Sequence, residues 1–461
     1  MTSNVSIRGG ARLKTEAIAA AEFGMASIAL SEDHEAVSKE TLLFVALGLV
    51  GASVPLALLA LVTAIGQPPT WNDFHAYWLA ARLLMAGQSP YDLDAMRSLG
   101  QAEGLRFVLG TGYSYPLPFA FLMIPLALLP FDSSILIFSA VSLIGFGLLV
   151  AWWLTTFHPL ASAGRLLAAA VAAGLFPPIF GSVDNGQANL VVLVPFAIGI
   201  ALTATPGRRD GLGGGLLGLA VVVKLVPGAV VAMLLGARRW IAAGAAVATI
   251  LGTLVVAEVL APPAALGVSW LSRLFEPDPY FTNQSINGFV SRLVLPSGRS
   301  VPLAPQAFDP FLFTLLITVS FGLATVAVLA WTARANMSER ALVLGIALAL
   351  VAATIAAPKN SFWNQALALP AVGLLVAAEA ADLEIWRFGR IDAALFASFW
   401  IGSFIQFALW VAPLPSHGTF SGFVTLAGSA ALYGMIALWV LLVRRLIHAS
   451  GGSRATRFAV G

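Results

Sequence analysis

The sequence has no cysteine, few charged side chains and only five histidines among its 461 residues. The lack of cysteine excludes disulfide bonds and thiolate metal sites. The histidines, at positions 34, 75, 158, 417 and 448, show no HxxxH spacing, so a histidine-rich metal site is not expected, although carboxylate ligands remain possible. The net charge of +3 gives no sign of a nucleic-acid-binding surface. We therefore expect no metal, no other cofactor and no nucleic acid partner.

Apolar residues are what the sequence has in abundance. They make up 59% of the chain, whose mean hydropathy is +0.89, whereas soluble domains are about 45–50% apolar. Long apolar runs recur from Thr41 to Val443, and the short alternating segments of a membrane β-barrel are missing. The composition predicts an all-α polytopic membrane protein surrounded by membrane lipids.

The apolar runs give a count of about ten transmembrane helices. We expect them at residues 41–65, 134–156, 166–180, 190–203, 241–261, 311–333, 341–357, 365–381, 391–412 and 420–443. Two further segments are ambiguous. Residues 117–131 are short and interrupted by prolines, which favours an interfacial or half-buried piece. Residues 212–236 contain Lys224 and Pro227, and a different interpretation of the two segments gives eleven or twelve helices.

Residues 212–236 pose a topology problem that the basic residues help to solve. As one span, this segment would put Arg238 and Arg239 outside, against the positive-inside rule. As two half-helices broken near Lys224, it keeps both arginines in the cytoplasm. A charged break within the membrane is tolerated where it lines a cavity. We therefore favour a re-entrant pair of half-helices.

The same rule predicts a single membrane-embedded domain at residues 41–461, with both termini in the cytoplasm and two large extracytoplasmic loops. A cytoplasmic tail at residues 1–40 precedes it. Within the domain we expect a catalytic module at 41–262, the second large outer loop at 262–309, C-terminal helices at 310–443 and a cytoplasmic tail at 444–461. No inverted repeat relates the halves, which weakens a symmetric transporter.

The polar stretch WNDFHAYWLAARLLMAGQSPYD, at residues 71–92, follows the first span and is unlike the rest of the chain. It carries Asp73, His75 and Arg82 in a chain with only 10% charged residues. Its apolar side chains recur at helical spacing, which favours an amphipathic helix lying at the membrane interface. A carboxylate just beyond a span is well placed to act on a substrate arriving from the lipid, so Asp73 is our candidate catalytic base.

Several non-adjacent loops bring amides, aromatic rings and cations to the same predicted outer face. Amides and carboxylates bind sugar hydroxyls, aromatic faces cover sugar C–H surfaces, and a lysine or arginine binds phosphate. The candidate substrate-binding residues are Asn72, His75, Tyr77, Arg82, Tyr115, Asn185, Gln187, Asn189, Lys224, Asn283, Gln284, Asn287, Lys359 and Asn364. Lys359 is a candidate for a donor phosphate, as is Lys224 if its break reaches the cavity.

Structural roles compete with these assignments. A carboxylate beyond a span is often an ordinary loop residue, and loop amides such as Asn185 or Asn287 often cap helices. The Lys224 side chain can equally extend toward the cytoplasm, and Trp and Tyr side chains in such loops are commonly interface anchors. Residue chemistry alone leaves these alternatives open.

Five blocks in a fixed order give the chain a family resemblance. They are WNDFHAYWLAARLLMAGQSPYD, YSYPLPFAFLMIPLALLPF, NGQANLVVLVPFAI, GLLGLAVVVKLVPG followed by ARRW, and NQSINGFVSRL. This order resembles glycosyltransferase family 87. The resemblance covers residues 71–293 in blocks and the later spans more loosely.

The resemblance implies the GT-C membrane glycosyltransferase architecture. It also implies an α-mannosyltransferase-like activity that takes its sugar from polyprenyl-phosphate-mannose on the outer side of the membrane. The implied reaction is a metal-independent, inverting single displacement onto a lipid or glycan acceptor, in which Asp73 accepts the proton of the acceptor hydroxyl. A carboxylate with an ordinary pKa suits this role because it is ionised at neutral pH.

The loop APKNSFWNQALALP, at residues 357–370, departs from part of that family pattern. Relatives that mannosylate phosphatidylinositol mannosides tend to carry a histidine pair where this chain has Trp363 and Asn364, so that acceptor is not carried over. Two other functions compete with the glycosyltransferase. One is a transporter or flippase of lipid-linked substrates, and the other is a catalytically silent relative that binds such lipids.

Overall fold

The computed structural model describes residues 39–66, 69–105, 112–204, 207–263, 275–297, 301–333, 338–380, 382–385, 388–411 and 422–458. Within these ranges the chain is almost entirely helical, and the β-pairing there is confined to an isolated bridge between Asn283 and Ser361. This confirms the predicted all-α fold. Most of the predicted tail at residues 1–40 lies outside the described residues, as do parts of the loop at 262–309.

Eight helical segments of the described chain are long and apolar enough to cross a membrane. They are α2 (Lys39–Ala64), α7 (Phe131–Phe157), α13 (Trp240–Leu260), α16 (Pro310–Ala333), α17 (Glu339–Ala356), the joined η2 (Phe362–Ala368) and α18 (Leu369–Glu379), α19 (Arg390–Val411) and α21 (Ala430–Phe458). A ninth is the bent pair α8 (Ala163–Leu175) and α9 (Pro177–Asp184). The chain is thus a multi-pass membrane protein.

Two shorter apolar helices complete the predicted set. These are α10 (Asn189–Ala204), which matches the span expected at 190–203, and α11 (Asp210–Val223). The proline-rich segment 117–131 forms two short helices, α5 (Leu117–Leu122) and α6 (Ile124–Ala127), neither of which spans. α15 (Ile286–Val294) and α20 (Gly422–Ala427) are also short. The expected spans are therefore present, with differences at three positions.

The first difference is at Pro177 and Pro178, where we expected a helix to end. The chain instead bends by 49° and continues as α9, because proline is well accommodated in the first turn of a new helix. The second is the predicted span 420–443, which divides into α20 and α21. The third is that α21 does not end at Val443 but continues as a helix through Phe458, while the predicted cytoplasmic position of residues 444–461 stays a prediction.

The half-helix prediction for residues 212–236 is confirmed. α11 ends at Val223, the chain breaks at Lys224, and α12 (Gly228–Gly236) follows. The guanidinium of Arg239, just after α12, lies 2.8 Å from the Asp210 carboxylate at the start of α11. The two half-helices therefore form a hairpin whose outer ends meet and whose tip is the break.

Glycines hold this hairpin against the neighbouring α13. At Gly214 and Gly218, an added Cβ atom would collide with the backbone of Ala242 and Ala246. Small residues let membrane helices approach closely and gain van der Waals contact. The GGGLLG run in α11 therefore fixes the depth of the Lys224 break.

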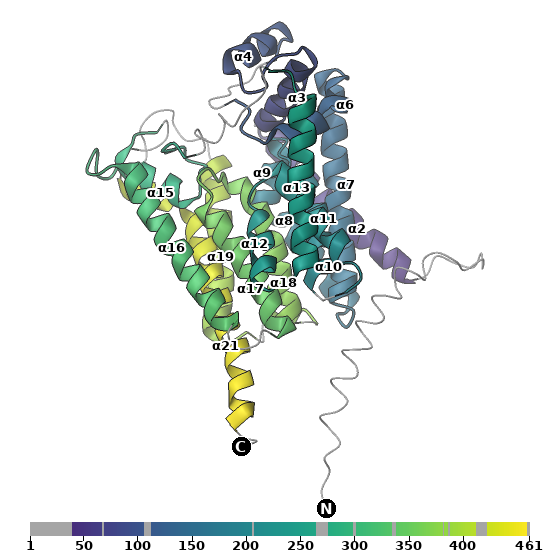
Figure 1. The fold of residues 1–461 in the computed structure, drawn as a ribbon, viewed down its shortest axis with the longest axis vertical. Helices are drawn as coiled ribbons and strands as arrows, with labels where there is room; N and C mark the ends of the chain where they lie inside the picture. Colours follow the sequence, from purple (N-terminus) through teal and green to yellow (C-terminus); the bar gives the residue numbers. More distant parts are fainter. Residues whose placement is uncertain are drawn as a thin grey trace, which may run out of the picture.

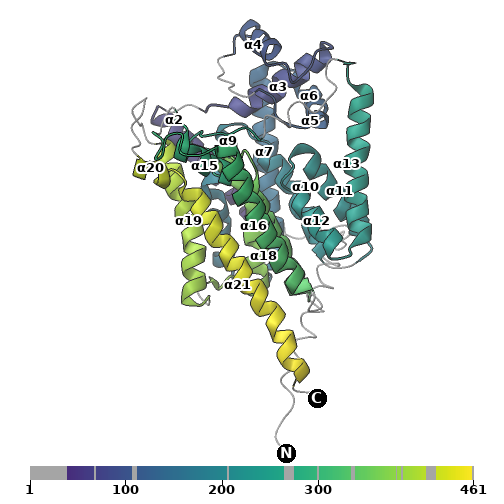
Figure 2. The same ribbon diagram turned by 60° about the vertical axis from the view of Figure 1, so that its left-hand side comes forward.

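Four helices gather at one end of the molecule, opposite the C-terminal end of α21 (Figure 1). They are α3 (Asn72–Met85), α4 (Leu93–Ala102), α5 and α6. Figure 2 shows α9 and α15 closer to this end than to the other. The end that carries α3 is also where the candidate site residues come together.

The interfacial position expected for α3 stays a prediction, but α3 is not the exposed amphipathic helix that the spacing suggested. Residues 74–81 are all buried, together with Leu83 and Leu84, so protein surrounds the helix on almost every side. α4, α5 and α6 pack against it, and Phe74 contacts Phe131 and Phe138 of α7 with ring centroids 5.5 and 5.0 Å apart. The apolar residues of α3 do recur at helical spacing, but other helices also cover its polar side.

Candidate active site

The start of α3 is held by the turn that follows α9. The Trp71 N–H donates to the Asp184 carbonyl at 2.9 Å, and the N–H groups of Asp73 and Phe74 donate to the Asn185 carbonyl at 3.1 and 3.4 Å. These are the N–H groups that a helix cannot satisfy internally. Trp71 has a left-handed backbone, with φ of 43°, so the chain enters α3 at a defined angle that positions Asp73.

A glycine makes this contact possible. Gly186 has φ of 61°, and a Cβ atom there would lie 2.6 Å from the Phe74 Cβ atom. Any other residue would push the turn away from α3. The Thr70 hydroxyl also lies 3.1 Å from side-chain oxygens of both Asp184 and Asn185. The sequence DNGQ therefore forms a tight turn that places Gln187 next to Asp73.

Gln187 connects side chains from several elements. Its Oε1 atom accepts hydrogen bonds from the Tyr77 hydroxyl at 3.1 Å, the Tyr115 hydroxyl at 3.0 Å and the Lys224 ammonium at 2.9 Å. The Gln187 side chain also hydrogen-bonds the Asp73 carboxyl group. Gln187 is buried, whereas Asp73 remains partly exposed.

Lys224 reaches this group from the hairpin break and makes a second contact. Its Nζ atom lies 2.6 Å from Oδ1 of Asn364, which belongs to η2. It also lies 5.5 Å from the centre of the Tyr115 ring, a cation–π distance. Of the two orientations considered for Lys224, toward the cavity or toward the cytoplasm, the structure shows the first. We call Asp73, Tyr77, Tyr115, Gln187, Lys224 and Asn364 the Asp73 cluster.

The electrostatics of the cluster suit a base. Burial raises the pKa of the Asp73 carboxyl to about 6, while the Lys224 ammonium and the Gln187 hydrogen bond oppose that rise. Asp73 is therefore ionised at neutral pH. Burial also lowers the pKa of His75, whose ring stacks on Phe131 at 4.4 Å and whose Nδ1 atom lies 2.8 Å from the Trp71 carbonyl oxygen. His75 is thus neutral and braces the start of α3.

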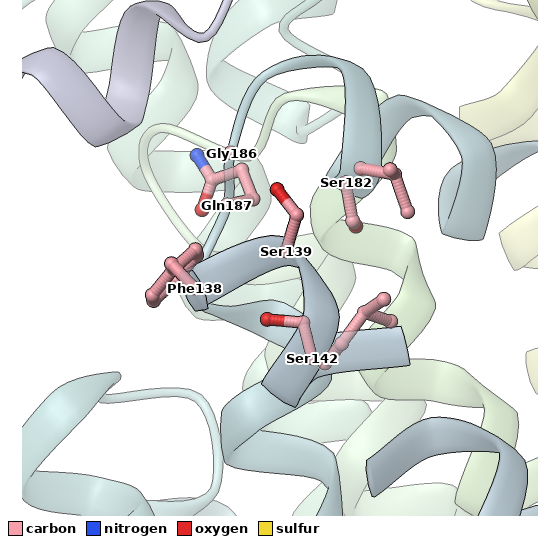
Figure 3. A pocket seen from close by; sticks show the side chains of 8 residues that line it. Phe138, Ser139, Ser142, Ser182, Gly186 and Gln187 are labelled. Carbon is pink, nitrogen blue, oxygen red and sulfur yellow. The ribbon is translucent and has the colours of Figure 1, made fainter. Parts of the chain in front are cut away.

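A small cavity lies behind Gln187 (Figure 3). Its volume is about 10 Å³, which is space for about one water molecule. Ser139 and Ser142 of α7 line it together with Ser182 and Gln187. The Ser142 hydroxyl has no hydrogen-bond partner within the described chain. This cavity is far too small for a sugar.

The amides of the second large loop have a different setting. Gln284 donates to the carbonyls of Phe281 and Gly428 and accepts from the Leu432 N–H. Oδ1 of Asn283 accepts from Ser285 and from the Asn360 N–H, and Nδ2 of Asn287 donates to the Glu276 carbonyl. All three side chains are buried. We call Asn283, Gln284, Asn287 and Arg292 the Asn283 cluster.

Arg292 is the residue of this cluster that sequence reasoning missed. It is 1% exposed and donates to the carbonyls of Tyr280 and Asn283 and to the Ser429 hydroxyl, at 3.0, 2.7 and 2.7 Å. A buried arginine held by backbone carbonyls fixes the path of a loop. The SRL end of the NQSINGFVSRL block was the available signal.

The other candidates lie apart from the Asp73 cluster or support it. Arg82 pairs with Glu103 at 2.7 Å, and Lys359 lies 4.0 Å from Glu276. Asn185 donates to the Gly181 carbonyl, and Asn189 to Ser182 and to the Trp363 carbonyl. Asn72 is the partly exposed first residue of α3. Substrate contacts by these residues remain predictions, but their internal partners show how the turn and η2 are held.

No group of three or more His, Cys, Asp or Glu side chains in the described ranges is placed to hold a metal ion. The expectation of a metal-independent reaction remains a prediction. The carboxylate, cation, amides and phenols of the Asp73 cluster are instead the groups available for chemistry. They can accept a proton, neutralise an anion and bind hydroxyls.

Comparison with known proteins identifies the class. The model of glycosyltransferase family 87 matches residues 113–358, more than half of the chain, so this protein belongs to glycosyltransferase family 87. The predicted family is therefore confirmed. The matched residues include Gln187 and Lys224 but begin after Asp73.

One curated relative gives a more particular likeness. The chain is 27% identical over 281 residues to a polyprenol-phosphate-mannose-dependent alpha-(1-2)-phosphatidylinositol pentamannoside mannosyltransferase of Mycolicibacterium smegmatis. The similarity covers 56% of this chain and 60% of the relative. The chain thus matches about 60% of the relative's length, which is less than two thirds.

Proposed function

We propose that this protein is a glycosyltransferase that moves a sugar, most simply mannose, from a polyprenyl-phosphate donor to a lipid or glycan acceptor. The observation that carries the proposal is the Asp73 cluster, where a partly exposed carboxylate and a lysine ammonium meet on one buried glutamine. Family membership supports the transferase class. The name of the Mycolicibacterium relative supports mannose as the sugar and polyprenol phosphate as its carrier.

The cluster provides the groups that an inverting single displacement needs. The acceptor hydroxyl oxygen forms a bond to the anomeric carbon as its proton passes to the Asp73 carboxylate. The bond from the anomeric carbon to the phosphate oxygen breaks, and polyprenyl phosphate leaves with the electron pair. Lys224 is suited to stabilise that anion. Tyr77 and Asn364 orient these groups.

The proposed site lies on the extracytoplasmic side of the cell membrane. Arg340 lies in the first turn of α17, and Arg444 and Arg445 lie in the second half of α21, which runs to the end of the molecule opposite α3 (Figure 1). Cytoplasmic segments carry the excess of lysine and arginine in membrane proteins. This orientation supports a donor lipid whose phosphate lies in the outer leaflet.

A transport assay and a transfer assay on the same vesicles test this function. Purified protein is placed in lipid vesicles with polyprenyl-phosphate-mannose labelled in the sugar and a lipid extract of its own host. We expect release of polyprenyl phosphate together with a new labelled lipid. Movement of intact donor across the bilayer without release would support a transporter or flippase. Tight donor binding without release or movement would support a silent relative.

A further inference from the structure

The orientation of the Gln187 amide is fixed by its neighbours. An ammonium can only donate hydrogen bonds, so the Gln187 atom 2.9 Å from Lys224 Nζ must be the carbonyl oxygen. The same oxygen accepts from the Tyr77 and Tyr115 hydroxyls, and both phenols stay protonated because burial raises their pKa. With the oxygen occupied, the amide nitrogen is the atom available to a further partner.

That further partner is Asp73. An ionised carboxylate can only accept, so its hydrogen bond with Gln187 uses the amide N–H. Lys224 itself contacts the amide oxygens of Gln187 and Asn364. Gln187 therefore stands between the carboxylate and the cation, with one end of its amide on each.

The surrounding elements contribute few other charges. On α3, Tyr77 and His75 are neutral, and Tyr115 before α5 is neutral. α7 supplies Ser139 and Ser142, and η2 supplies Asn364. Asp184 of α9 is the nearby second carboxylate, and it is held by Thr70 on the far side of the turn. Lys224 is thus the cation that acts on Asp73.

We propose that Gln187 is a positioning residue that joins Asp73 and Lys224 into one hydrogen-bonded unit, so that an anion bound at Lys224 also acts on the catalytic carboxylate. This inference rests on the proposed function, in which the anion is the donor phosphate. A phosphate at Lys224 offsets the positive field that keeps Asp73 ionised. Asp73 then becomes a stronger base when the donor is bound. Proton transfer therefore depends on donor binding.

Carbodiimide labelling tests whether Gln187 joins Asp73 to Lys224, and it does not require transfer activity. Carbodiimides react with protonated carboxyl groups, so the labelled fraction of Asp73, read by mass spectrometry, gives its titration curve in lipid. The variants are Gln187→Met, which loses the amide, and Gln187→Glu, which keeps an acceptor for Lys224 but loses the donor and adds a negative charge. Gln406→Met removes a buried amide from α19 and is the matched control.

We expect Gln187→Met to move the Asp73 midpoint up by about one pH unit, because the hydrogen bond that favours the carboxylate is lost. Gln187→Glu should move it further, since a like charge adds to the loss. Gln406→Met should leave it unchanged. The proposed role of Gln187 is overturned if Asp73 has the same midpoint in Gln187→Met as in the wild type. It is also overturned if Gln406→Met shifts the Asp73 midpoint as much as Gln187→Met does, because that would indicate a general structural effect.

Adding polyprenyl phosphate as the probe separates this inference from the proposed function. We expect it to raise the midpoint in the wild type and to have no effect in Lys224→Gln. If polyprenyl phosphate raises the midpoint equally in Lys224→Gln, the anion acts elsewhere and the link is rejected. If Gln187→Met shifts the midpoint but polyprenyl phosphate never does, Gln187 remains the positioning residue and the phosphate site at Lys224 is what fails.

Discussion

The Asp73 cluster and the Asn283 cluster are built from similar residues but are connected differently. Both contain amide side chains and one buried cation. In the Asn283 cluster most of the amide and guanidinium contacts end on backbone groups or on nearby side chains of the same loop. In the Asp73 cluster, side chains of α3, the turn after α9, the hairpin break and η2 meet one another.

This difference indicates that the Asn283 cluster has a structural role, whereas the Asp73 cluster is suited to bind a ligand. Backbone groups have fixed positions, so an arginine held by carbonyls shapes a loop and has little capacity left for a ligand. A lysine held by two amide oxygens remains able to bind a substrate anion. The Asn283 cluster still serves the site, because Asn283 pairs with the chain just before η2 and so helps to place Asn364.

The largest expected effect is at Lys224 of the Asp73 cluster, compared with Lys359, which lies outside both clusters. Lys224→Gln should lower sugar transfer by about 10²–10³-fold, because a preorganised charge that stabilises the leaving anion is lost. Lys359→Gln is the matched control, since its weak contact with Glu276 spans 4.0 Å. Transfer rates at saturating and at limiting donor concentrations measure the effect of each of the two substitutions. A larger loss at Lys359 would move the phosphate site to the segment between α17 and η2.

Arg292 should matter for stability rather than for chemistry. Arg292→Met leaves two buried carbonyls and a hydroxyl without their donor, which we expect to cost roughly 3 kcal/mol. Thermal unfolding in detergent measures this loss. Arg97→Met, which removes an exposed contact with Asp94, should melt like the wild type. A fully stable but inactive Arg292→Met protein would place Arg292 in the active site.

The pH dependence should reflect Asp73. A general base must be ionised, and burial raises the pKa of Asp73 to about 6. Transfer should therefore be constant near neutral pH and fall about tenfold per unit below pH 6. In Lys224→Gln the fall should begin at higher pH, because the cation that favours the carboxylate is gone. A flat profile down to pH 4 would indicate a different base.

The smallest effect should be at Arg82. Its ion pair with Glu103 is about one third exposed, and such pairs contribute about 0–1 kcal/mol. Arg82→Met should therefore change transfer by less than about fivefold, and Glu103→Gln should behave similarly. The transfer kinetics of both variants show whether Arg82 supports the fold through Glu103 or binds the substrate. A large loss in Arg82→Met alone would restore our original assignment of Arg82 to the substrate.

The sequence was sufficient for the membrane fold and for the hairpin break. Long apolar runs located the spans, and the arginines around residues 212–236 required a return of the chain at Lys224. The surroundings of α3 were not predictable in the same way. Helical spacing shows that a helix has two faces, but not that α4, α5 and α6 will cover both.

The site was only partly predictable for a similar reason. Asp73, Gln187, Lys224 and Asn364 were all candidates, yet the sequence could not show that they meet while the amides of residues 283–287 bond to the backbone. Residue type gives the capacity to form hydrogen bonds, whereas the partner is set by packing. Arg292 was missed because a single arginine in an amphipathic helix resembles a solvent-facing residue.

The most direct test of the account is a single-turnover measurement of polyprenyl phosphate release from polyprenyl-phosphate-mannose. It compares the wild type with Asp73→Asn and Asp92→Asn. Asp92 is an exposed cap of α4, and asparagine caps equally well, so this control makes the same chemical change outside the cluster. We predict that Asp73→Asn loses about 10²–10⁴-fold and that Asp92→Asn keeps its activity. Unchanged release by a folded Asp73→Asn protein would contradict the account.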